Sequence, residues 1–107
     1  MNTLKSIIRV KLPQCPINIC LEVDPRGILI SAVPQLDTRK IRIYRQVANQ
    51  FVKIIDIPIV GLLKKEQFLD KQAGSGKIRY KITAVSKDGE SKPKFLETII
   101  YKPLKSR

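Results

Sequence analysis

The segment KIRYKITAVS, residues 77–86, decides the fold class of this chain. Every second residue is apolar, and the residues between them are polar or charged. The apolar set is Ile78, Tyr80, Ile82 and Ala84, and the polar set is Lys77, Arg79, Lys81 and Thr83. A period of two matches a β-strand, whose successive side chains point to opposite faces. β-Branched residues also pack well on a pleated sheet and lose rotamer freedom in a helix. We therefore expect a strand with one buried face.

Six further segments on either side of residues 77–86 have strand character. They are residues 17–23, 28–33, 40–45, 51–57, 65–69 and 95–101. Turn sequences separate several of them, such as Asp24-Pro25-Arg26-Gly27 and Asp88-Gly89. The segment 65–69 is short, and a helix there is the alternative. Seven short strands at this spacing predict an all-β protein, a seven-stranded β-sandwich rather than an α/β fold.

A set of residues between positions 43 and 93 follows the pattern of a known family. They are Ile43-Tyr44-Arg45, Phe51, Lys53-Ile54, Phe68-Leu69-Asp70, Gly76, the run from Tyr80 to Val85, Asp88-Gly89-Glu90-Ser91 and Pro93. With these residues, the chain from about residue 16 to residue 103 resembles a fibronectin type III domain. The resemblance implies that Tyr80 is a corner tyrosine, whose hydroxyl ties down the preceding turn. A core tyrosine without a special hydrogen bond is the alternative.

Two positions depart from that family. Ala32 stands where the second strand usually carries a tryptophan, so Phe51, Phe68 or the many isoleucines are expected to fill the core centre. Lys87-Asp88-Gly89 stands where some members carry an integrin-binding tripeptide. Integrin recognition therefore gets no support.

The length of 107 residues indicates a single domain. We expect an N-terminal arm at residues 1–14, the fibronectin type III-like domain at residues 15–103 and a basic C-terminal tail at residues 104–107. The arm is too apolar for a free tail. Its candidate partner contacts are Ile7, Ile8, Val10 and Leu12.

The arm has two possible places. Arg9 and Lys11 alternate with apolar neighbours, as on a strand with one buried side. The arm could cover apolar residues that the strand pattern turns outward on its own sandwich, Leu29 and Val33. It could instead add a strand to a neighbouring copy, and we expect this second arrangement in a multi-copy assembly. Alternatively, the outward apolar residues are ordinary scatter on the surface, which requires neither arrangement of the arm.

The composition excludes much of catalysis. Histidine is absent, which removes the usual general base and the commonest metal ligand. Cys15 and Cys20 are five residues apart in an extended stretch, so we expect free thiols, although a tight turn could join them. Gly74-Ser75-Gly76 precedes a strand rather than a helix and predicts a hairpin loop. We expect no enzyme, no metal, no cofactor and no small-molecule substrate.

No apolar run approaches the roughly 18 residues that a membrane span requires. Lys5, Arg9 and Lys11 interrupt the stretch where a signal peptide would be apolar. We therefore expect no signal peptide and no membrane span, with the protein in a virion or the cytoplasm.

The formal net charge of +12 comes from 21 lysines and arginines against 9 acidic residues. In the fibronectin-like topology the strands at 40–45 and 77–86 are neighbours, which places five cations on one outward face. This basic face consists of Lys40, Arg42, Lys77, Arg79 and Lys81. Like charges on adjacent strands repel unless anions lie between them, so the face predicts an anionic partner. A solvated face of a lysine-rich chain is the alternative.

The kind of anion depends on the aromatic residues. Nucleic-acid binding normally adds exposed aromatics for stacking. Tyr80 is assigned to the core, and Phe51, Phe68 and Phe95 are expected to join it, so few rings remain outside. An acidic protein surface explains the charge without aromatics and is the expected partner; nucleic acid is the less favoured one.

These expectations give one function. The chain is predicted to be a non-enzymatic structural or adaptor subunit that docks on a larger assembly through its basic face and arm. The resemblance, with isoleucine- and lysine-rich usage, favours a head, neck, tail or decoration component of a phage virion. A cytoplasmic nucleic-acid-binding module and an accessory protein-binding domain of an enzyme complex are the alternatives.

Overall fold

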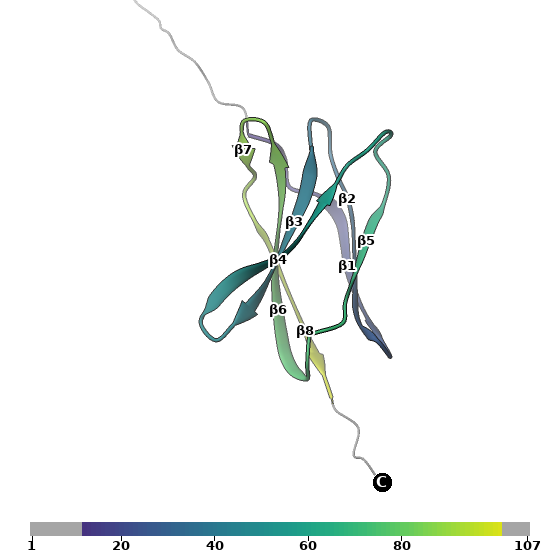
Figure 1. The fold of residues 1–107 in the computed structure, drawn as a ribbon, viewed down its shortest axis with the longest axis vertical. Helices are drawn as coiled ribbons and strands as arrows, with labels where there is room; N and C mark the ends of the chain where they lie inside the picture. Colours follow the sequence, from purple (N-terminus) through teal and green to yellow (C-terminus); the bar gives the residue numbers. More distant parts are fainter. Residues whose placement is uncertain (1–11, 102–107) are drawn as a thin grey trace, which may run out of the picture.

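The computed structural model describes residues 12–101 as two antiparallel β-sheets packed face to face, with no helix in that range. The smaller sheet has the order β1-β2-β5, with β1 (Ile17–Asp24), β2 (Gly27–Val33) and β5 (Glu66–Asp70). The larger sheet has the order β4-β3-β6, and both β7 and β8 pair with β6. Its strands are β3 (Lys40–Val47), β4 (Gln50–Pro58), β6 (Gly76–Ser86), β7 (Gly89–Glu90) and β8 (Lys94–Ile100). Figure 1 shows the two layers and the β3–β4 hairpin that extends from the larger one. The predicted all-β sandwich is confirmed.

Each of the seven expected strands is present with its ends displaced by one or two residues. The segment at 65–69 is a strand, not a helix, because β5 pairs with β2 from Ile28↔Asp70 to Ala32↔Glu66. A short strand, β7, adds an eighth element that the sequence pattern did not predict. It pairs only two residues with the end of β6.

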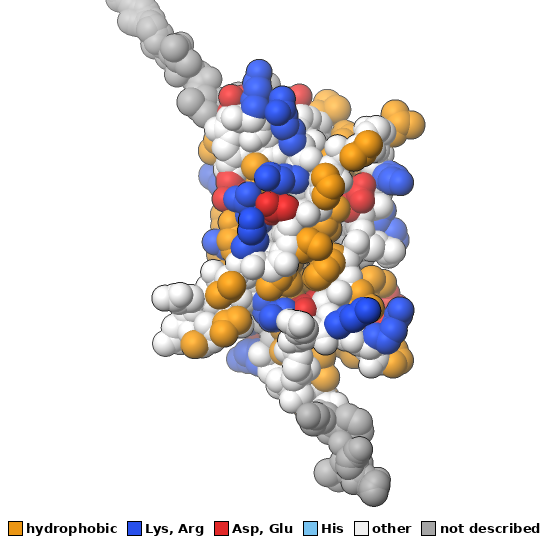
Figure 2. Space-filling model, in the orientation of Figure 1, with side chains coloured by type: hydrophobic (Ala, Val, Ile, Leu, Met, Phe, Trp, Pro, Cys, Tyr) orange, Lys and Arg blue, Asp and Glu red, His pale blue; other side chains and the backbone are white. Residues whose placement is uncertain are grey.

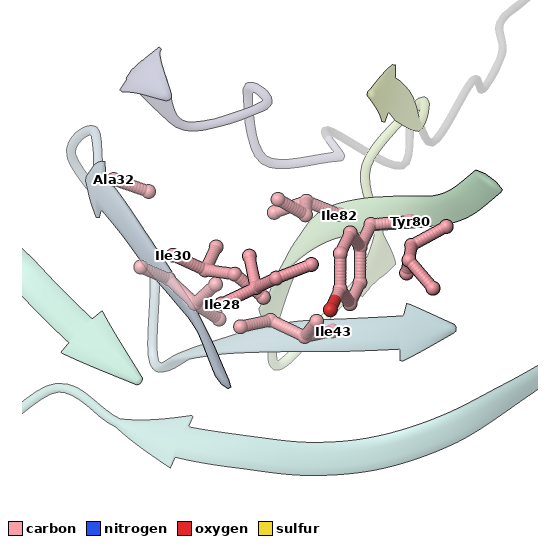
Figure 3. Close-up of a cluster of buried hydrophobic side chains, with 8 residues drawn as sticks. Ile28, Ile30, Ala32, Ile43, Tyr80 and Ile82 are labelled. Carbon is pink, nitrogen blue, oxygen red and sulfur yellow. The ribbon is translucent and has the colours of Figure 1, made fainter. Parts of the chain in front are cut away.

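The core consists mainly of isoleucines from both sheets. The largest fully buried side chains are Tyr80, Ile28, Ile30, Ile41, Ile43 and Ile82. Figure 3 shows the Tyr80 ring among these isoleucines, with Ala32 at the margin of the cluster. Ala32 is buried at the position of the missing tryptophan, and β-branched aliphatic side chains fill the space around it. Phe68 packs against this core, as expected, whereas Phe51 does not belong to it.

A polar network lies at one end of the core. The Tyr80 hydroxyl donates a hydrogen bond to Asp70 Oδ2 at 2.6 Å, and Arg45 Nη1 donates to both carboxylate oxygens of Asp70 at 2.7 Å. Burial and the Asp70 hydrogen bond raise the pKa of Tyr80. Asp70 ends β5, so the Tyr80 hydroxyl ties down the segment before its own strand, through a carboxylate. The hydrogen bond implied by the family resemblance is therefore present.

The β1–β2 turn approaches this network closely. Gly27 has a φ of +153°, and a Cβ there would overlap the backbone oxygen of Asp70. Glycine is required because any side chain would displace the end of β5.

Only part of the arm prediction falls on described residues. Ile7, Ile8 and Val10 lie outside them, whereas Leu12 is half exposed beside the β6–β7 turn, with Cδ2 3.0 Å from the Cβ position of Gly89. The boundaries 1–14, 15–103 and 104–107 remain predictions.

The structure also describes the two cysteines and two apolar residues of the smaller sheet. Cys15 and Cys20 are both free thiols, and Cys15 Sγ lies 3.8 Å from the carbonyl oxygen of Ile82. On the outer side of the smaller sheet, Leu29 and Val33 are half-buried. Among residues 12–101, no helix is long and apolar enough to cross a membrane.

Candidate interaction face

The five predicted cations all lie on one face of the larger sheet, the side away from the core, called here the outer face. β3 and β6 are neighbours, as expected, and the alternation that buries Ile43 and Ile82 turns Arg42 and Lys81 outward. Their register, however, does not place like charges opposite one another. Arg42 pairs across the strands with Thr83, and Tyr44 pairs with Lys81.

The anions between the cations belong to the protein itself. Asp56 of β4 accepts hydrogen bonds from Arg42 Nε at 2.8 Å and from Lys53 Nζ at 3.3 Å, and Lys40 Nζ lies 3.4 Å from it. The hydrogen bond from Arg42 lowers the pKa of Asp56 to about 2, although partial burial opposes this shift. Figure 2 shows cationic and acidic side chains interleaved over this part of the sheet. The repulsion between these cations, from which an external anionic partner was predicted, is therefore reduced by carboxylates of the chain itself.

A second carboxylate, Glu90 of β7, also lies on the outer face. It accepts hydrogen bonds from the Thr83 hydroxyl at 2.6 Å and from the Tyr44 hydroxyl. Arg42 Nη1 lies 3.5 Å from its other oxygen. Burial raises the pKa of Glu90, but these hydrogen bonds and the nearby Arg42 and Lys81 charges outweigh burial, so the pKa is lowered.

The third carboxylate of the outer face lies beside the cations at the other end of β6. Glu97 of β8 lies 3.3 Å from Arg79 Nε and 3.8 Å from Lys77 Nζ. The side chains of Lys77 and Arg79 are much more exposed than that of Arg42, at 61% and 46% against 22%. This end therefore presents two accessible cations that share one exposed carboxylate.

Aromatic rings lie on the outer face as well. Lys81 Nζ is 4.1 Å from the centroid of the Tyr44 ring and 5.7 Å from that of Phe51, which permits cation–π attraction. The Phe51 and Phe95 rings are tilted with centroids 5.5 Å apart, and Phe95 is 52% exposed. The expectation that Phe51 and Phe95 join the core is wrong.

The misplacement of Phe95 has a simple cause. Across β6 and β8, Phe95 pairs with Lys81 and Leu96 pairs with Tyr80, so Phe95 shares the parity of the outward lysine. The neighbouring Leu96 supplies the inward apolar residue. Assigning faces by the alternation of residues along β8, rather than by hydrophobicity alone, would have placed Phe95 outside.

Together these residues form an apolar and basic area along β6 and β8, which we call the β6–β8 patch. It consists of Lys77, Arg79, Lys81, Phe51, Phe95 and Ile99. Ile99 lies opposite Lys77 and is exposed. An apolar centre with cations beside it is typical of a protein interface rather than of a solvated charged face.

Metal-binding or nucleophilic chemistry has little support in the described range. Among residues 12–101, no three His, Cys, Asp or Glu side chains gather where they could hold a metal ion. Burial raises the pKa of the Cys15 thiol, which disfavours the reactive thiolate.

Comparison with known proteins agrees with this architecture. A solved structure described as "Structure of FN3tt mut" has a TM-score of 0.66 at 14% identity, with 83% of this chain and 97% of that chain covered. The "Crystal Structure of FN3tt" gives 0.66 at 13% identity, covering 84% and 96%. This chain has the fibronectin type III fold. An Fn3-like protein from Clostridium thermocellum has a TM-score of 0.57 at 17% identity, covering 89% of this chain and 98% of that one.

At these identities the likeness shows the fold alone. No protein-family model matches the sequence, and no curated protein is significantly similar to it.

Proposed function

We propose that this fibronectin type III domain is a non-enzymatic structural or adaptor subunit that docks on an acidic protein surface of a larger assembly. The β6–β8 patch is the contact, and the observation that carries the proposal is the exposure of Phe95 and Ile99 beside Lys77 and Arg79. Exposed aromatic and aliphatic side chains supply binding energy when a partner covers them. The flanking cations orient an acidic partner.

The other two predicted cations, Lys40 and Arg42, have a lesser role in this proposal. Asp56 and Glu90 already neutralise them, so an acidic partner would have to displace an internal carboxylate. They add to the positive field of the outer face, which carries six cations against three carboxylates once Lys53 is included. A positive field of this kind accelerates the encounter with an acidic partner.

The N-terminal arm is the second proposed contact. Its candidate residues are Ile7, Ile8, Val10 and Leu12. β4 and β8 each have only one neighbouring strand in the described part of the larger sheet, so each offers a free edge to an added strand. A strand donated between copies would hold several subunits together. Within this class we favour a phage particle, an inference that rests on residue usage and family resemblance.

Nucleic acid is a second candidate for the patch because Phe95 is exposed next to cations. Exposed rings beside Lys and Arg can stack bases and contact phosphates. The internal carboxylates Glu90 and Glu97 oppose phosphate binding, which is why the acidic protein surface remains the first choice.

The test uses a photo-reactive amino acid at position 95 in cells that make the protein. We expect it to crosslink one protein partner, whereas the same reagent at position 23, exposed on the smaller sheet, should not. With that partner purified, Arg79→Glu and Phe95→Ala should each weaken binding by about tenfold or more. Arg26→Glu is the matched control, since it makes the same charge change at the β1–β2 turn.

The competing outcomes are distinct. Crosslinks to nucleic acid, with an affinity whose logarithm falls by about 0.7 to 0.9 per contacted phosphate for each tenfold rise in salt, would favour the second candidate. Equal crosslinking from positions 95 and 23 would refute the patch as the docking site.

A further inference from the structure

One end of the sandwich has features that the proposed function does not use. The β2–β3 connection, the β4–β5 connection and the β6–β7 turn lie together there (Figure 1). A backbone hydrogen bond of 2.8 Å from Ile59 N to Arg39 O joins the first two, and one of 2.8 Å from Arg39 N to Val85 O ties them to the end of β6, just before the turn. We call residues 34–39, 59–65 and 87–88 the loop end.

Three aliphatic side chains of the loop end make little contact with the domain. Val60 is 79% exposed, Leu62 87% and Leu36 78%, whereas the neighbouring Leu63 is 38% exposed. Gly61 adopts a φ of +78°, and nothing lies within 4 Å of where its Cβ would be. The tip of the β4–β5 connection therefore stands away from the rest of the protein. Figure 2 shows apolar side chains projecting at this end of the molecule.

Four cations lie on the same three connections as these apolar side chains. Lys64 and Lys65 follow the tip directly, and Arg39 and Lys87 lie on the adjoining connections; all four are exposed. Asp37 and Asp88 are the exposed acidic residues in the same ranges. The loop end thus combines a projecting aliphatic tip with a surrounding excess of positive charge.

These two properties restrict what can cover the loop end. A second copy in the same pose would bring the four cations of each loop end together, and the two acidic residues of each, Asp37 and Asp88, offset only part of that charge. A flat protein surface would bury little of a projecting tip. The interfacial region of a lipid bilayer can close around aliphatic side chains, and anionic headgroups attract lysine and arginine located at that depth.

We propose that the loop end binds the surface of an anionic membrane, with the Val60–Leu62 tip inserted among the headgroups and Lys64 and Lys65 against lipid phosphates. The contact is peripheral and requires no membrane-spanning segment. It goes beyond the proposed function and does not rest on it, since the β6–β8 patch lies along β6 and β8 rather than on these connections.

The test is co-sedimentation of the full chain with vesicles of phosphatidylcholine alone and of phosphatidylcholine with an equal amount of phosphatidylglycerol. We expect binding only to the anionic vesicles. Leu62→Ser should weaken it by about tenfold without changing net charge, because it removes the apolar side chain that is buried in the bound state. Lys64→Ala and Lys65→Ala should each weaken it by about fivefold.

Three controls separate insertion from general attraction of a basic protein. Val23→Ser removes an exposed aliphatic side chain of the β1–β2 end and should leave binding unchanged. Arg79→Ala removes one charge from the β6–β8 patch and should weaken vesicle binding less than Lys64→Ala. With Cys15 and Cys20 replaced by serine, an environment-sensitive fluorophore attached to Leu62→Cys should shift to the blue on anionic vesicles, whereas one attached to Val23→Cys should not.

The proposal fails under either of two results. Binding that Leu62→Ser leaves intact, with no fluorescence shift at position 62, would mean surface adsorption by net charge. Absence of binding to anionic vesicles would also overturn it and would leave an acidic protein with an apolar pocket as the occupant of the loop end. Neither result affects the crosslinking test at position 95, so the two proposals fail independently.

Discussion

Two arginine–carboxylate pairs of this domain lie in opposite settings. Arg45 and Asp70 meet at the edge of the core, where the Asp70 side chain is 4% exposed and also accepts a hydrogen bond from Tyr80. Arg42 and Asp56 meet on the outer face, where both side chains are 22% exposed and Lys40 and Lys53 share the carboxylate. The same chemistry stabilises the fold in one place and shapes a surface in the other. Burial decides which, because water competes for exposed charges and not for buried ones.

The largest effect is expected from Asp70→Ala. This change leaves Arg45 without its partner near the core and removes the acceptor for Tyr80, so the free energy of unfolding should fall by about 3–5 kcal/mol. Urea unfolding followed by circular dichroism measures the loss. Asp70→Asn keeps a hydrogen-bond acceptor but loses the charge. Its free energy of unfolding should therefore lie between those of Asp70→Ala and the original protein. A loss below about 1 kcal/mol for Asp70→Ala would contradict a structural role for the pair.

Tyr80→Phe separates the hydroxyl from the ring. The expected loss is about 1–3 kcal/mol, because Asp70 loses a buried donor while the ring packing remains. Tyr44→Phe is the matched control on the outer face, where the hydroxyl donates to the less buried Glu90. Equal losses of stability from the two variants would show that the buried hydroxyl of Tyr80 contributes no more than the outer hydroxyl of Tyr44, which would contradict this comparison.

Acid titration tests the outer pair. The hydrogen bond from Arg42 lowers the pKa of Asp56 from 3.8 to about 2 in the folded state. Because the folded pKa lies below the unfolded value, this contribution to stability is complete above about pH 4 and disappears as the pH falls toward 2. Asp56→Asn should flatten the dependence of unfolding free energy on pH in that window. An unchanged slope would show that Arg42 does not hold the carboxylate in solution.

The smallest effect is expected from a third pair, Arg26 and Asp24. Arg26 Nε lies 2.9 Å from Asp24 Oδ1, a geometry close to that of the other two pairs, but the arginine side chain is 69% exposed. Arg26→Ala should give no measurable change in thermal unfolding, because solvent competes fully for the exposed charge. A clear destabilisation would mean that distance, rather than burial, ranks the three pairs.

Much of the fold could be predicted from local pattern. The alternation in residues 77–86 identified the inward residues of β6 correctly, and the turn residues after 23 and 87 marked where strands reverse. The short strand at 66–70 was harder, because its pairing with β2 rather than its own sequence holds it extended. The outward placement of Lys40 and Arg42 also followed from alternation, since a period of two assigns faces without knowledge of the partner strand.

The carboxylates of the outer face could not be predicted in the same way. Asp56, Glu90 and Glu97 come from three different strands, and their contacts with Arg42 and Arg79 depend on the register between strands. A stretch of sequence specifies the faces of its own strand but not which residue of another strand lies opposite.

The amino-acid sequence by itself determined the strand pattern, the buried face of β6 and the excess of positive charge, because these follow from side-chain type and a local period of two. Only the tertiary structure decided that Asp70 is the partner of Tyr80, that Phe95 lies outside and that three carboxylates of the chain pair with four of the five cations of the basic face. These outcomes depend on the register of β4 against β3, of β3 against β6 and of β6 against β8, and on how the two sheets pack. The physical reason is that register is set by the packing of the whole sandwich, which brings together residues that no local pattern connects.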